Sequence, residues 1–470
     1  ILLEEKKSQR TMSLEDFVIS QLQDVVLSGK TRNEKWRRRQ LHALSNLLEN
    51  HQKEILNALR EDLRKPPTEA FFEIIAIKQE IKLAQKNLYN WIQPKQINVP
   101  VSLRPSKAFV QPDPLGCILI IGPWNYPFSL ALQPLVGALA AGNTAVLKPS
   151  EHAPHVSNLI KKLIEKYFDP NVTQVIEGDG NIAADLITQK FDHIFFTGGE
   201  NIGKKVMEAA AKNLTPVTLE LGGKSPAIII DGANLEVTAR RIIWGKSLNA
   251  GQTCIAPDHL LVEHKLFDSL TSHLKKSISD FYGDSPLDSK HLGSIINQRQ
   301  FNRLYNLLTN AKKNNQIIFG GDCNESERRM SPTLIKIENR SDPLMKEELF
   351  GPLLPILSIK NLEQAITDLK LLPKPLALYL FGGGENEQGK VLSMTSSGGV
   401  CFNDVVLQAG IPELPFGGVG TSGMGKYHGK AGFDNFTHYK SVLKRPFWLD
   451  LNFRYPPYKL DLSLLDKLIG

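Results

Sequence analysis

The chain has 470 residues, of which 41% are hydrophobic and 22% are charged, a composition typical of a globular protein and not of a disordered or fibrous one. This length is sufficient for two or three domains with substantial cores. The formal net charge of +7 would suit a nucleic-acid surface, but the densest basic run, from Lys35 to Arg39, lies within a helical pattern. That placement favours a solvated helix face, and we expect no nucleic-acid partner.

Cysteine usage and the first residues bear on the cellular compartment. No C-x-x-C pair and no histidine spacing typical of zinc accompanies the four cysteines, Cys117, Cys254, Cys323 and Cys401. We therefore predict no disulfide framework, no metal site and a reducing, cytoplasmic location. The stretch from Ile1 to Lys7 becomes charged too early for a cleavable signal peptide.

Two stretches bear on membrane attachment. No charged residue occurs between Asp113 and Lys148, which is long enough for a membrane span. Prolines and glycines divide this stretch, so we predict a buried strand–turn–helix–strand unit and no transmembrane anchor. The end of the chain, Leu460 to Ile469, is mildly amphipathic, which leaves peripheral membrane contact as an alternative.

The N-terminal part, residues 13 to 93, predicts helices. Ser13 and Thr31 each stand three residues before an acidic residue and are predicted N-caps. The Pro66-Pro67 pair comes before a further helix that ends near Trp91. Apolar residues then alternate from 96 to 110, which predicts an extended hairpin that a second subunit can cover.

Beyond Pro114, short apolar runs alternate with helical stretches. The predicted strands are 116–121, 144–147, 173–176, 193–196 and 227–230, with helices at 130–141, 154–167 and 180–189. This alternation predicts an α/β fold with a doubly wound parallel sheet. Such a sheet binds ligands at the carboxyl ends of its strands, so the turns that follow the strands are candidate sites.

One loop, from Asn249 to Pro257, carries Cys254 among small residues. Gly251 allows the backbone to approach a ligand, and two alanines leave room around the sulfur. Cys254 is therefore a candidate nucleophile. A free cysteine is more often a small residue of the core, so its partners decide between the two interpretations.

Two turns after strands present polar side chains. Prolines flank Trp124, Asn125 and Tyr126, and this stiff turn can hold the Asn125 amide as an oxyanion donor; the alternative is a cap of the next helix. In the second turn, Lys148 and Glu151 present a cation and a carboxylate that suit ribose hydroxyls. A surface ion pair is the alternative.

A third turn, Gly198 to Lys204, has the spacing of a P-loop. Lys205 stands where a P-loop needs Ser or Thr, which argues against ATP or GTP hydrolysis, whereas a dinucleotide pyrophosphate at a helix start needs no hydroxyl there. Further on, Glu220 lies between apolar residues ahead of two glycines. This setting raises a carboxyl pKa and suits a general base, although it is also typical of a strand-end carboxylate.

Together these turns resemble one family, the aldehyde dehydrogenases, from about Trp36 to Tyr458. The motifs that carry the resemblance are, in order, PWNYP, LKPSE, FTGGENIGK, LELGGKSP, NAGQTCIAPD, EELFGP and PFGGVGTSGMG. RIIWGKSLNAGQTCIAPD and the stretch from Arg454 to Pro457 look most like the class three, fatty-aldehyde-like branch. Gly199-Glu200 departs from the Ser or Asn followed by Thr that is usual in the family.

The resemblance implies an α/β, aldehyde dehydrogenase-like fold with a Rossmann-type doubly wound cofactor domain, an α/β catalytic domain and a small β oligomerisation element. The expected division is 1–95 and 111–220 for NAD(P) binding, 221–425 for catalysis, 96–110 and 426–447 for a bridging element, and 448–470 for a C-terminal tail. It also implies a homodimer, formed through 96–110 and a late strand near Tyr439 to Leu443.

The activity implied by the resemblance is NAD(P)-dependent oxidation of an aldehyde to a carboxylic acid. Cys254 attacks the carbonyl, the Asn125 amide and the Cys254 N–H hold the oxyanion, and Glu220 activates water for thioester hydrolysis. We expect nearby donors, a helix N-terminus or the cationic cofactor ring to lower the pKa of Cys254. The residues implied to hold the cofactor are Lys148 and Glu151 at the adenosine ribose, Gly198 and Gly203 at the pyrophosphate, and Glu348 and Phe350 at the nicotinamide ribose and ring. NAD is the expected cofactor, with NADP also used.

The substrate is less constrained. Tyr126, Trp244 and Phe402 are expected to line an apolar entrance, which fits medium- or long-chain aliphatic or aromatic aldehydes. A cofactor-free cysteine hydrolase, with His428 or His438 paired to Cys254, is one alternative. A dehydrogenase that passes the thioester to coenzyme A is another, although it would lack the water-activating carboxylate.

Overall fold

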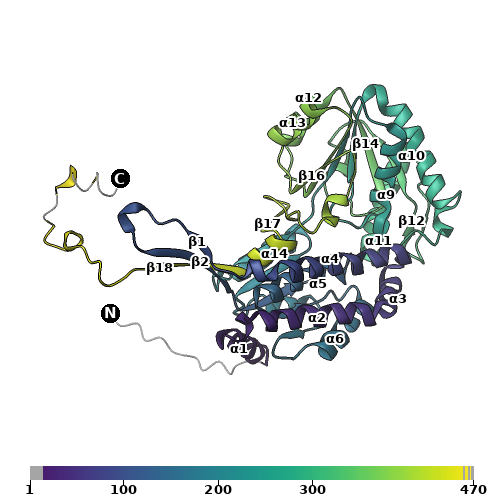
Figure 1. Ribbon diagram of the computed structural model, residues 1–470. Coiled ribbons are helices and arrows are strands. Elements are labelled where there is room, and N and C mark those ends of the chain that lie inside the picture. Colours follow the sequence, from purple (N-terminus) through teal and green to yellow (C-terminus); the bar gives the residue numbers. More distant parts are fainter. Residues whose placement is uncertain (1–13, 459–460, 464–465, 467–470) are drawn as a thin grey trace, which may run out of the picture.

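The computed structural model describes residues 14–458, 461–463 and 466, which form three main sheets. A six-stranded sheet has the order β17-β7-β6-β3-β4-β5, and a seven-stranded sheet has the order β10-β13-β14-β9-β8-β15-β16. The third sheet, β1-β2-β18, extends from the body of the molecule as an arm (Figure 1).

The six-stranded sheet is parallel except at one edge. Its parallel strands are β3 (Cys117–Ile121), β4 (Thr144–Lys148), β5 (Thr173–Val175), β6 (His193–Thr197) and β7 (Val217–Glu220). The short strand β17 (Gly423–Met424) pairs antiparallel with β7, although it comes from much later in the chain. Every residue of β3 and β4 is buried, as expected for inner strands covered on both faces by helices.

Helices cover both faces of this sheet. They are α1 (Leu14–Leu27), α2 (Glu34–Asn50), α3 (Gln52–Leu63), α4 (Pro67–Trp91), α5 (Ser129–Ala141), α6 (Pro154–Tyr167), α7 (Gly180–Leu186), α8 (Glu200–Ala211) and the late α14 (Gly429–Asn435). No helix in the described part of the chain is long and apolar enough to cross a membrane. The uncharged stretch after Asp113 is instead β3, α5 and β4, which are packed in the core.

Two details of the N-terminal helices differ from the sequence predictions. The N-cap of α2 is Asn33, whose side chain accepts hydrogen bonds from the N–H groups of Lys35 and Trp36. Thr31 is not the cap but the one buried residue of a short 3-10 turn. Arg37 points inward: its guanidinium donates to Thr31 O and Ala140 O, both at 3.0 Å, so the basic run is only in part a solvated face. The predicted cap at Ser13 lies outside the described residues.

The seven-stranded sheet is also mostly parallel. It comprises β8 (Pro226–Ile229), β9 (His259–Glu263), β13 (Thr333–Ile337), β14 (Leu353–Ile359), β15 (Ala377–Phe381), β16 (Gly399–Phe402) and the antiparallel edge β10 (Ile317–Phe319), with β11 (Cys323–Asn324) and β12 (Arg329–Met330) as a separate pair. One face packs on α9 (Leu235–Ser247) and α10 (Phe267–Tyr282), and the other on α11 (Gln298–Lys313), α12 (Leu362–Lys370) and α13 (Glu385–Met394).

The predicted strand 227–230 therefore belongs to a different sheet from its predecessors. The chain leaves the six-stranded sheet at Glu220, crosses Gly222 and Gly223, and enters the seven-stranded sheet as β8. A single run of alternating strands and helices does not reveal such a change of sheet. Glu220 consequently lies where the two sheets meet.

The arm is built from segments far apart in sequence. Strands β1 (Lys95–Ile97) and β2 (Lys107–Pro114) form the predicted hairpin, and β18 (Thr437–Lys444) pairs antiparallel with β2 along its whole length (Figure 1). Apolar side chains remain exposed on and beside it, including Ile97, Val101 and Leu443.

A buried ion pair fixes the turn that leads into α5. Lys65 and Glu73 are both fully buried; the Lys65 ammonium donates to Glu73 Oε1 and to Asn125 O, the latter at 2.8 Å. Glu73 Oε2 accepts from the N–H groups of Phe128 and Ser129, at 3.1 and 2.9 Å, and so caps α5. Burial lowers the pKa of Lys65, whereas Glu73 raises it. The pair thus fixes the turn both at Asn125 and at the start of α5.

We predict that Lys65→Met strongly destabilises the protein. Removing one member of a fully buried pair leaves the other charge uncompensated, at a cost of about 3–5 kcal/mol. The measurement is the midpoint of urea unfolding followed by circular dichroism, with Lys390→Met as the control because Lys390 forms an exposed pair with Glu363. A midpoint shift no larger than that of the control would contradict this role of Lys65.

Candidate active site

The loop that carries Cys254 has unusual backbone geometry. Asn249, Ala250 and Gly251 have consecutive positive φ angles of 53°, 54° and 78°. A left-handed conformation costs roughly 1–2 kcal/mol for each residue with a side chain. At Gly251 even a methyl group is excluded, because it would collide with the carbonyl of Gly351. The loop keeps this shape only if its surroundings hold it.

Hydrogen bonds of the Gln252 and Glu69 side chains stabilise this loop conformation. The buried Gln252 amide donates to Asn249 O and Ser294 O, at 2.9 and 3.0 Å, and accepts from Ile296 N at 2.9 Å. Glu69, from α4, accepts from Asn249 N at 2.8 Å, and burial raises the pKa of Glu69 to about 7. Buried polar groups that are fully hydrogen-bonded specify one conformation, so the loop presents Cys254 in a fixed orientation.

The structure directs Asn125 at this loop. The Asn125 amide donates to Gln252 O at 3.1 Å, and its backbone carbonyl accepts from Asn249 Nδ2 at 2.7 Å. Asn125 does not cap the next helix, because Glu73 caps it from another element. The helix-cap alternative is therefore wrong, and the amide lies against the loop of Cys254, at Gln252.

The surroundings of the Cys254 thiol raise its pKa. Burial contributes most, followed by the carboxyl groups of Glu348 and Glu220, while the backbone N–H groups of Cys254 and Ile255 act in the opposite direction. The backbone donors thus act in the predicted direction, but burial and the two carboxyl groups outweigh them, so the protein's own groups raise this pKa overall. The influence of both carboxyl groups also means that Glu348 and Glu220 lie close to the sulfur.

Glu220 is a buried carboxyl group without a hydrogen bond. It ends β7, is 3% exposed, and neither oxygen finds a partner among the described residues. Burial raises the pKa of Glu220 well above its ordinary value. The raised pKa favours the neutral form of this carboxyl group, and its anion, once formed, is a stronger base than an exposed glutamate.

Glu348 and Phe350 approach from the seven-stranded side. Burial and then Asp258 raise the pKa of Glu348 to about 8, while a hydrogen bond from Gly223 N–H opposes them. The Glu348 carboxyl lies in a space that a side chain at Gly222 would fill. The Phe350 ring makes an edge contact with Trp124, with ring centres 5.2 Å apart, so it is held against the turn that carries Asn125.

The residues at the ends of β4 and β6 fit a dinucleotide. The buried Lys148 ammonium donates to Pro149 O at 2.9 Å and lies 3.4 Å from Glu151 Oε2, whose side chain is 36% exposed. Thr197 Oγ1 is buried without a hydrogen-bond partner in the described chain, and no side chain caps the N-terminus of α8. A cation, a hydroxyl and free helix N–H groups are the donor set that phosphate and ribose groups use.

The two glycines predicted at the pyrophosphate also have a packing role. A Cβ at Gly198 would come within 2.5 Å of the Phe196 ring, and one at Gly203 within 2.8 Å of Leu221. Their lack of a side chain allows α8 to pack closely on the end of the sheet. Among the described residues, no group of three or more His, Cys, Asp or Glu side chains is placed to hold a metal ion.

The predicted substrate residues divide between two places. Tyr126 lies beside the loop of Cys254, with its hydroxyl 2.7 Å from Thr253 Oγ1, and Trp244 packs on the same core cluster as Cys254. Phe402 does not join them. Side chains alternate along β16, so Phe402 packs on the other face of the seven-stranded sheet, and Cys401 is on the face of Cys254.

A cavity of about 200 Å³ adjoins Ile255, the residue after Cys254. Its walls are mainly apolar side chains and glycine backbone, including Leu376, Val400, Leu414 and Phe416. The one amide side chain in its wall is Gln408. An apolar cavity next to a nucleophile suits a substrate with an aliphatic or aromatic portion.

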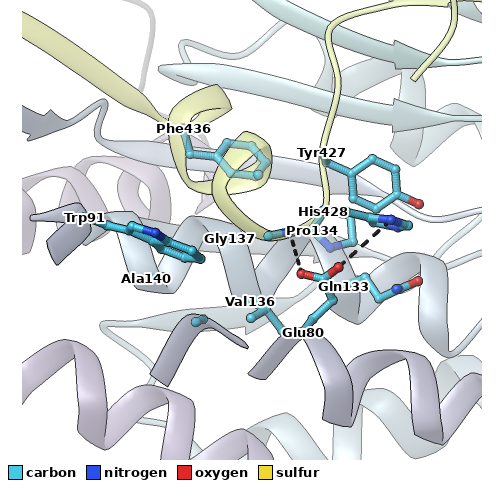
Figure 2. Close-up of a pocket in the computed structure, with 13 residues that line it drawn as sticks. Glu80, Trp91, Gln133, Pro134, Val136, Gly137, Ala140, Tyr427, His428 and Phe436 are labelled. Carbon is cyan, nitrogen blue, oxygen red and sulfur yellow. Dashed lines mark hydrogen bonds and ion pairs between the residues drawn. The ribbon is translucent and has the colours of Figure 1, made fainter. Parts of the chain in front are cut away.

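The histidines considered as partners of Cys254 have other surroundings. Figure 2 shows His428 facing Glu80, with Nδ1 4.0 Å from Glu80 Oε1, and the His428 ring stacks on Phe416. His438 lies on β18 in the arm, opposite Asp113. No hydrogen bond from a histidine of the described residues reaches Cys254, so a cysteine–histidine pair is not formed.

Several residues of the site were not among the sequence predictions. Lys65, Glu69 and Glu73 come from the N-terminal helices, and Tyr427 is a buried residue whose pKa is raised by burial and then by Glu220 and Cys254, so it lies near both. A signal for Glu73 was present: it interrupts the buried, apolar stripe of α4, as does Glu80. A carboxylate in such a stripe indicates a specific buried partner.

The comparisons with known proteins agree with these features. A model described as "Aldehyde dehydrogenase family" matches residues 29–442. The chain is 42% identical over 455 residues to aldehyde dehydrogenase family 3 member H1 of Arabidopsis thaliana, covering 96% of this chain and 94% of the relative. It is 41% identical over 449 residues to "Aldehyde dehydrogenase, dimeric NADP-preferring" of Rattus norvegicus, covering 95% and 98%.

A solved structure, "Substrate bound state of Staphylococcus Aureus AldH", has a TM-score of 0.95 at 43% identity and covers 98% of this chain and 100% of that one. The predicted α/β, aldehyde dehydrogenase-like fold is thereby confirmed. The chain belongs to the aldehyde dehydrogenase family, with relatives in its class three branch, and is an NAD(P)-dependent oxidoreductase that oxidises aldehydes.

Proposed function

We propose that the enzyme converts medium- or long-chain aliphatic or aromatic aldehydes into carboxylic acids through a thioester at Cys254. The observation that supports this proposal is that the Asn125 amide bonds Gln252 in the loop of Cys254, while the Glu220 carboxyl acts on the pKa of the Cys254 thiol. The apolar cavity beside Ile255 supports an apolar substrate.

The first step is addition of the Cys254 sulfur to the carbonyl carbon of the aldehyde. The carbonyl oxygen gains negative charge, which the Asn125 amide and the Cys254 N–H are proposed to stabilise. The Asn125 carbonyl is held by Lys65 and Asn249, so the amide needs little reorganisation during the reaction. Such preorganised donors typically contribute the largest single effect on the rate.

The cofactor is proposed to lie between the two sheets. Lys148 and Glu151 would hold the adenosine ribose, Gly198 and Gly203 would lie near the pyrophosphate, and Glu348 and Phe350 would position the nicotinamide ribose and ring. When bound, the dinucleotide supplies the acceptor for the hydride of the substrate. Both NAD and NADP remain candidates, since the rat relative is named NADP-preferring whereas Glu151 favours NAD.

Glu220 is proposed to take a proton from the water that hydrolyses the thioester. Water then bonds to the acyl carbon, the carbon–sulfur bond breaks, and the carboxylic acid and the Cys254 thiol are released. Transfer of the acyl group to coenzyme A is disfavoured, because a buried carboxyl suited to activate water lies beside the thiol. A hydrolase without cofactor is disfavoured by the absence of a bonded histidine in the described residues.

We also propose which function each segment of the chain has. Residues 1–95 and 111–220 bind the cofactor, 221–425 carry the nucleophile, 96–110 and 426–447 bridge subunits, and 448–470 form a tail. A homodimer would cover the exposed apolar residues of the arm, and the rat relative is named dimeric. Inside the last bridging segment, α14 packs on α4 and α5, so this part also anchors the arm to the body.

Cys254→Ala should abolish aldehyde oxidation, because no other group at the site can form the covalent intermediate. The measurement is NADH formation at 340 nm with hexanal and NAD, alongside fluorescence titration of the cofactor, which should bind as in the wild type. Cys401→Ala is the matched control, since Cys401 packs on the same core cluster. Substantial turnover by Cys254→Ala would remove this residue from the mechanism.

Glu220→Gln should slow thioester hydrolysis and leave acylation, so a burst of about one NADH per site should precede a slow phase. In the wild type the hydrolysis step should accelerate as pH rises, because burial raises the pKa of Glu220 and its basic form appears only at higher pH. The variant should lose this dependence. A trace without a burst and with the wild-type rate would exclude Glu220 as the base.

Glu151→Gln should narrow the preference for NAD over NADP. A carboxylate accepts hydrogen bonds from the ribose, whereas it repels a 2′-phosphate. At ~4 Å and an effective dielectric of about 20 this repulsion is about 4 kcal/mol, which exposure and salt reduce, so we expect about a tenfold preference. The measurement is kcat/KM for each cofactor, with Glu165→Gln on the exposed face of α6 as the charge-matched control. An unchanged ratio in Glu151→Gln would place this carboxylate away from the ribose.

A further inference from the structure

We propose that Tyr379 is a positioning residue for aldehyde oxidation, whose hydroxyl joins the loop of the nucleophile to the loop that walls the substrate cavity. Tyr379 lies on β15, an inner strand between β8 and β16, and is fully buried. This inference rests on the proposed function and adds a residue to it.

The Tyr379 hydroxyl uses its full hydrogen-bonding capacity. It donates to Ile255 O at 2.5 Å and accepts from Val406 N at 3.3 Å and from Gln408 Nε2 at 3.2 Å. A phenol has one donor and two acceptor positions, so each is occupied. Because the site is buried, loss of the hydroxyl would leave the Ile255 carbonyl and the Val406 N–H without this partner.

The Ile255 end of this connection reaches the nucleophile directly. Ile255 follows Cys254, its N–H interacts with the Cys254 sulfur, and its side chain lines the cavity. A hydrogen bond at the Ile255 carbonyl limits rotation of this residue. It thereby keeps the Ile255 N–H directed at the sulfur that it stabilises.

The other end of this connection is a strained turn at Val406. Val406 has φ 66° and ψ −35°, a conformation that is a genuine outlier for a β-branched residue. Gly245 of α9 allows the turn to pack closely, since a side chain there would collide with Val405. Strain of this kind persists only where the surroundings enforce it, and the Tyr379 hydroxyl supplies one such restraint at the Val406 N–H.

The turn at Val406 continues into the cavity wall. Gln408 lines the cavity with its amide bonded to Tyr379, and Val406 and Ala409 pack on the same core cluster as Cys254. One hydroxyl therefore sets the position of the wall relative to the sulfur. A shift of one loop without the other would misalign a bound carbonyl carbon and the nucleophile, to which rates are very sensitive.

The test compares Tyr379→Phe with Tyr282→Phe. Tyr282 is a half-buried tyrosine on α10 and belongs to neither loop, so its variant removes one hydroxyl and leaves the contacts of Tyr379 in place. Two readouts are needed: kcat and KM for hexanal with NAD, and the pH dependence of alkylation of Cys254 by iodoacetamide, followed by mass spectrometry of the peptide that contains it.

Tyr379→Phe should lower kcat/KM about 10-fold, the effect of losing one to two buried hydrogen bonds, and should move the alkylation midpoint to higher pH. Cofactor affinity and the circular dichroism spectrum should stay as in the wild type, and Tyr282→Phe should keep wild-type kinetics. An unchanged alkylation midpoint in Tyr379→Phe, or an equal loss in Tyr282→Phe, would overturn the proposal.

If Tyr379→Phe does not fold, Gln408→Leu replaces it, because it removes a donor to the same hydroxyl from a half-buried position. It should shift the alkylation midpoint in the same direction, and an unchanged midpoint would overturn the proposal. Alkylation uses no aldehyde, so it tests Tyr379 even if the wild type fails to oxidise hexanal, a result that would count against the proposed substrate class alone.

Discussion

The left-handed backbone of Asn249, Ala250 and Gly251 is the constraint on which the rest of the site depends. Two of these residues carry side chains, so the conformation costs roughly 2–4 kcal/mol before any contact is counted. Gln252 and Glu69 offset that cost with buried hydrogen bonds to the loop itself. Without the strained turn the chain would leave α9 in another direction, and Cys254 would not face the turn that carries Asn125.

The need to stabilise this loop explains why helices from the start of the chain reach into a site that lies where the two large sheets meet. Glu69 binds Asn249, and Lys65 binds the carbonyl of Asn125 while paired with Glu73. These groups lie on either side of Pro66 and along the first two turns of α4. One short segment therefore positions both the loop of Cys254 and the turn of Asn125. Its buried ion pair favours a single conformation of that turn.

The turns after strands could be predicted from the sequence where their signals are local. Apolar runs and proline-flanked turns identified the strand ends near Asn125 and Lys148, whereas β7, which ends at Glu220, was not among the predicted strands. The supporting residues could not be predicted in this way, since Lys65 and Glu73 gain their meaning only from elements far along the chain. The side of β16 that faces Cys254 also depends on the register of a sheet, which placed Phe402 on the opposite face.

Under the proposed mechanism, the pKa of Cys254 depends on the protonation of the two carboxyl groups beside it. Glu348 and Glu220 raise that pKa, so a thiolate forms most easily while both are protonated, which is the form that their own raised pKa values favour. Once the sulfur is part of a thioester it carries no charge, and the repulsion that opposes ionisation of Glu220 is removed. Glu220 can then lose its proton and act as the base in the hydrolysis step. The thiolate and the Glu220 anion therefore disfavour each other, so the base forms more easily once the acyl group is in place.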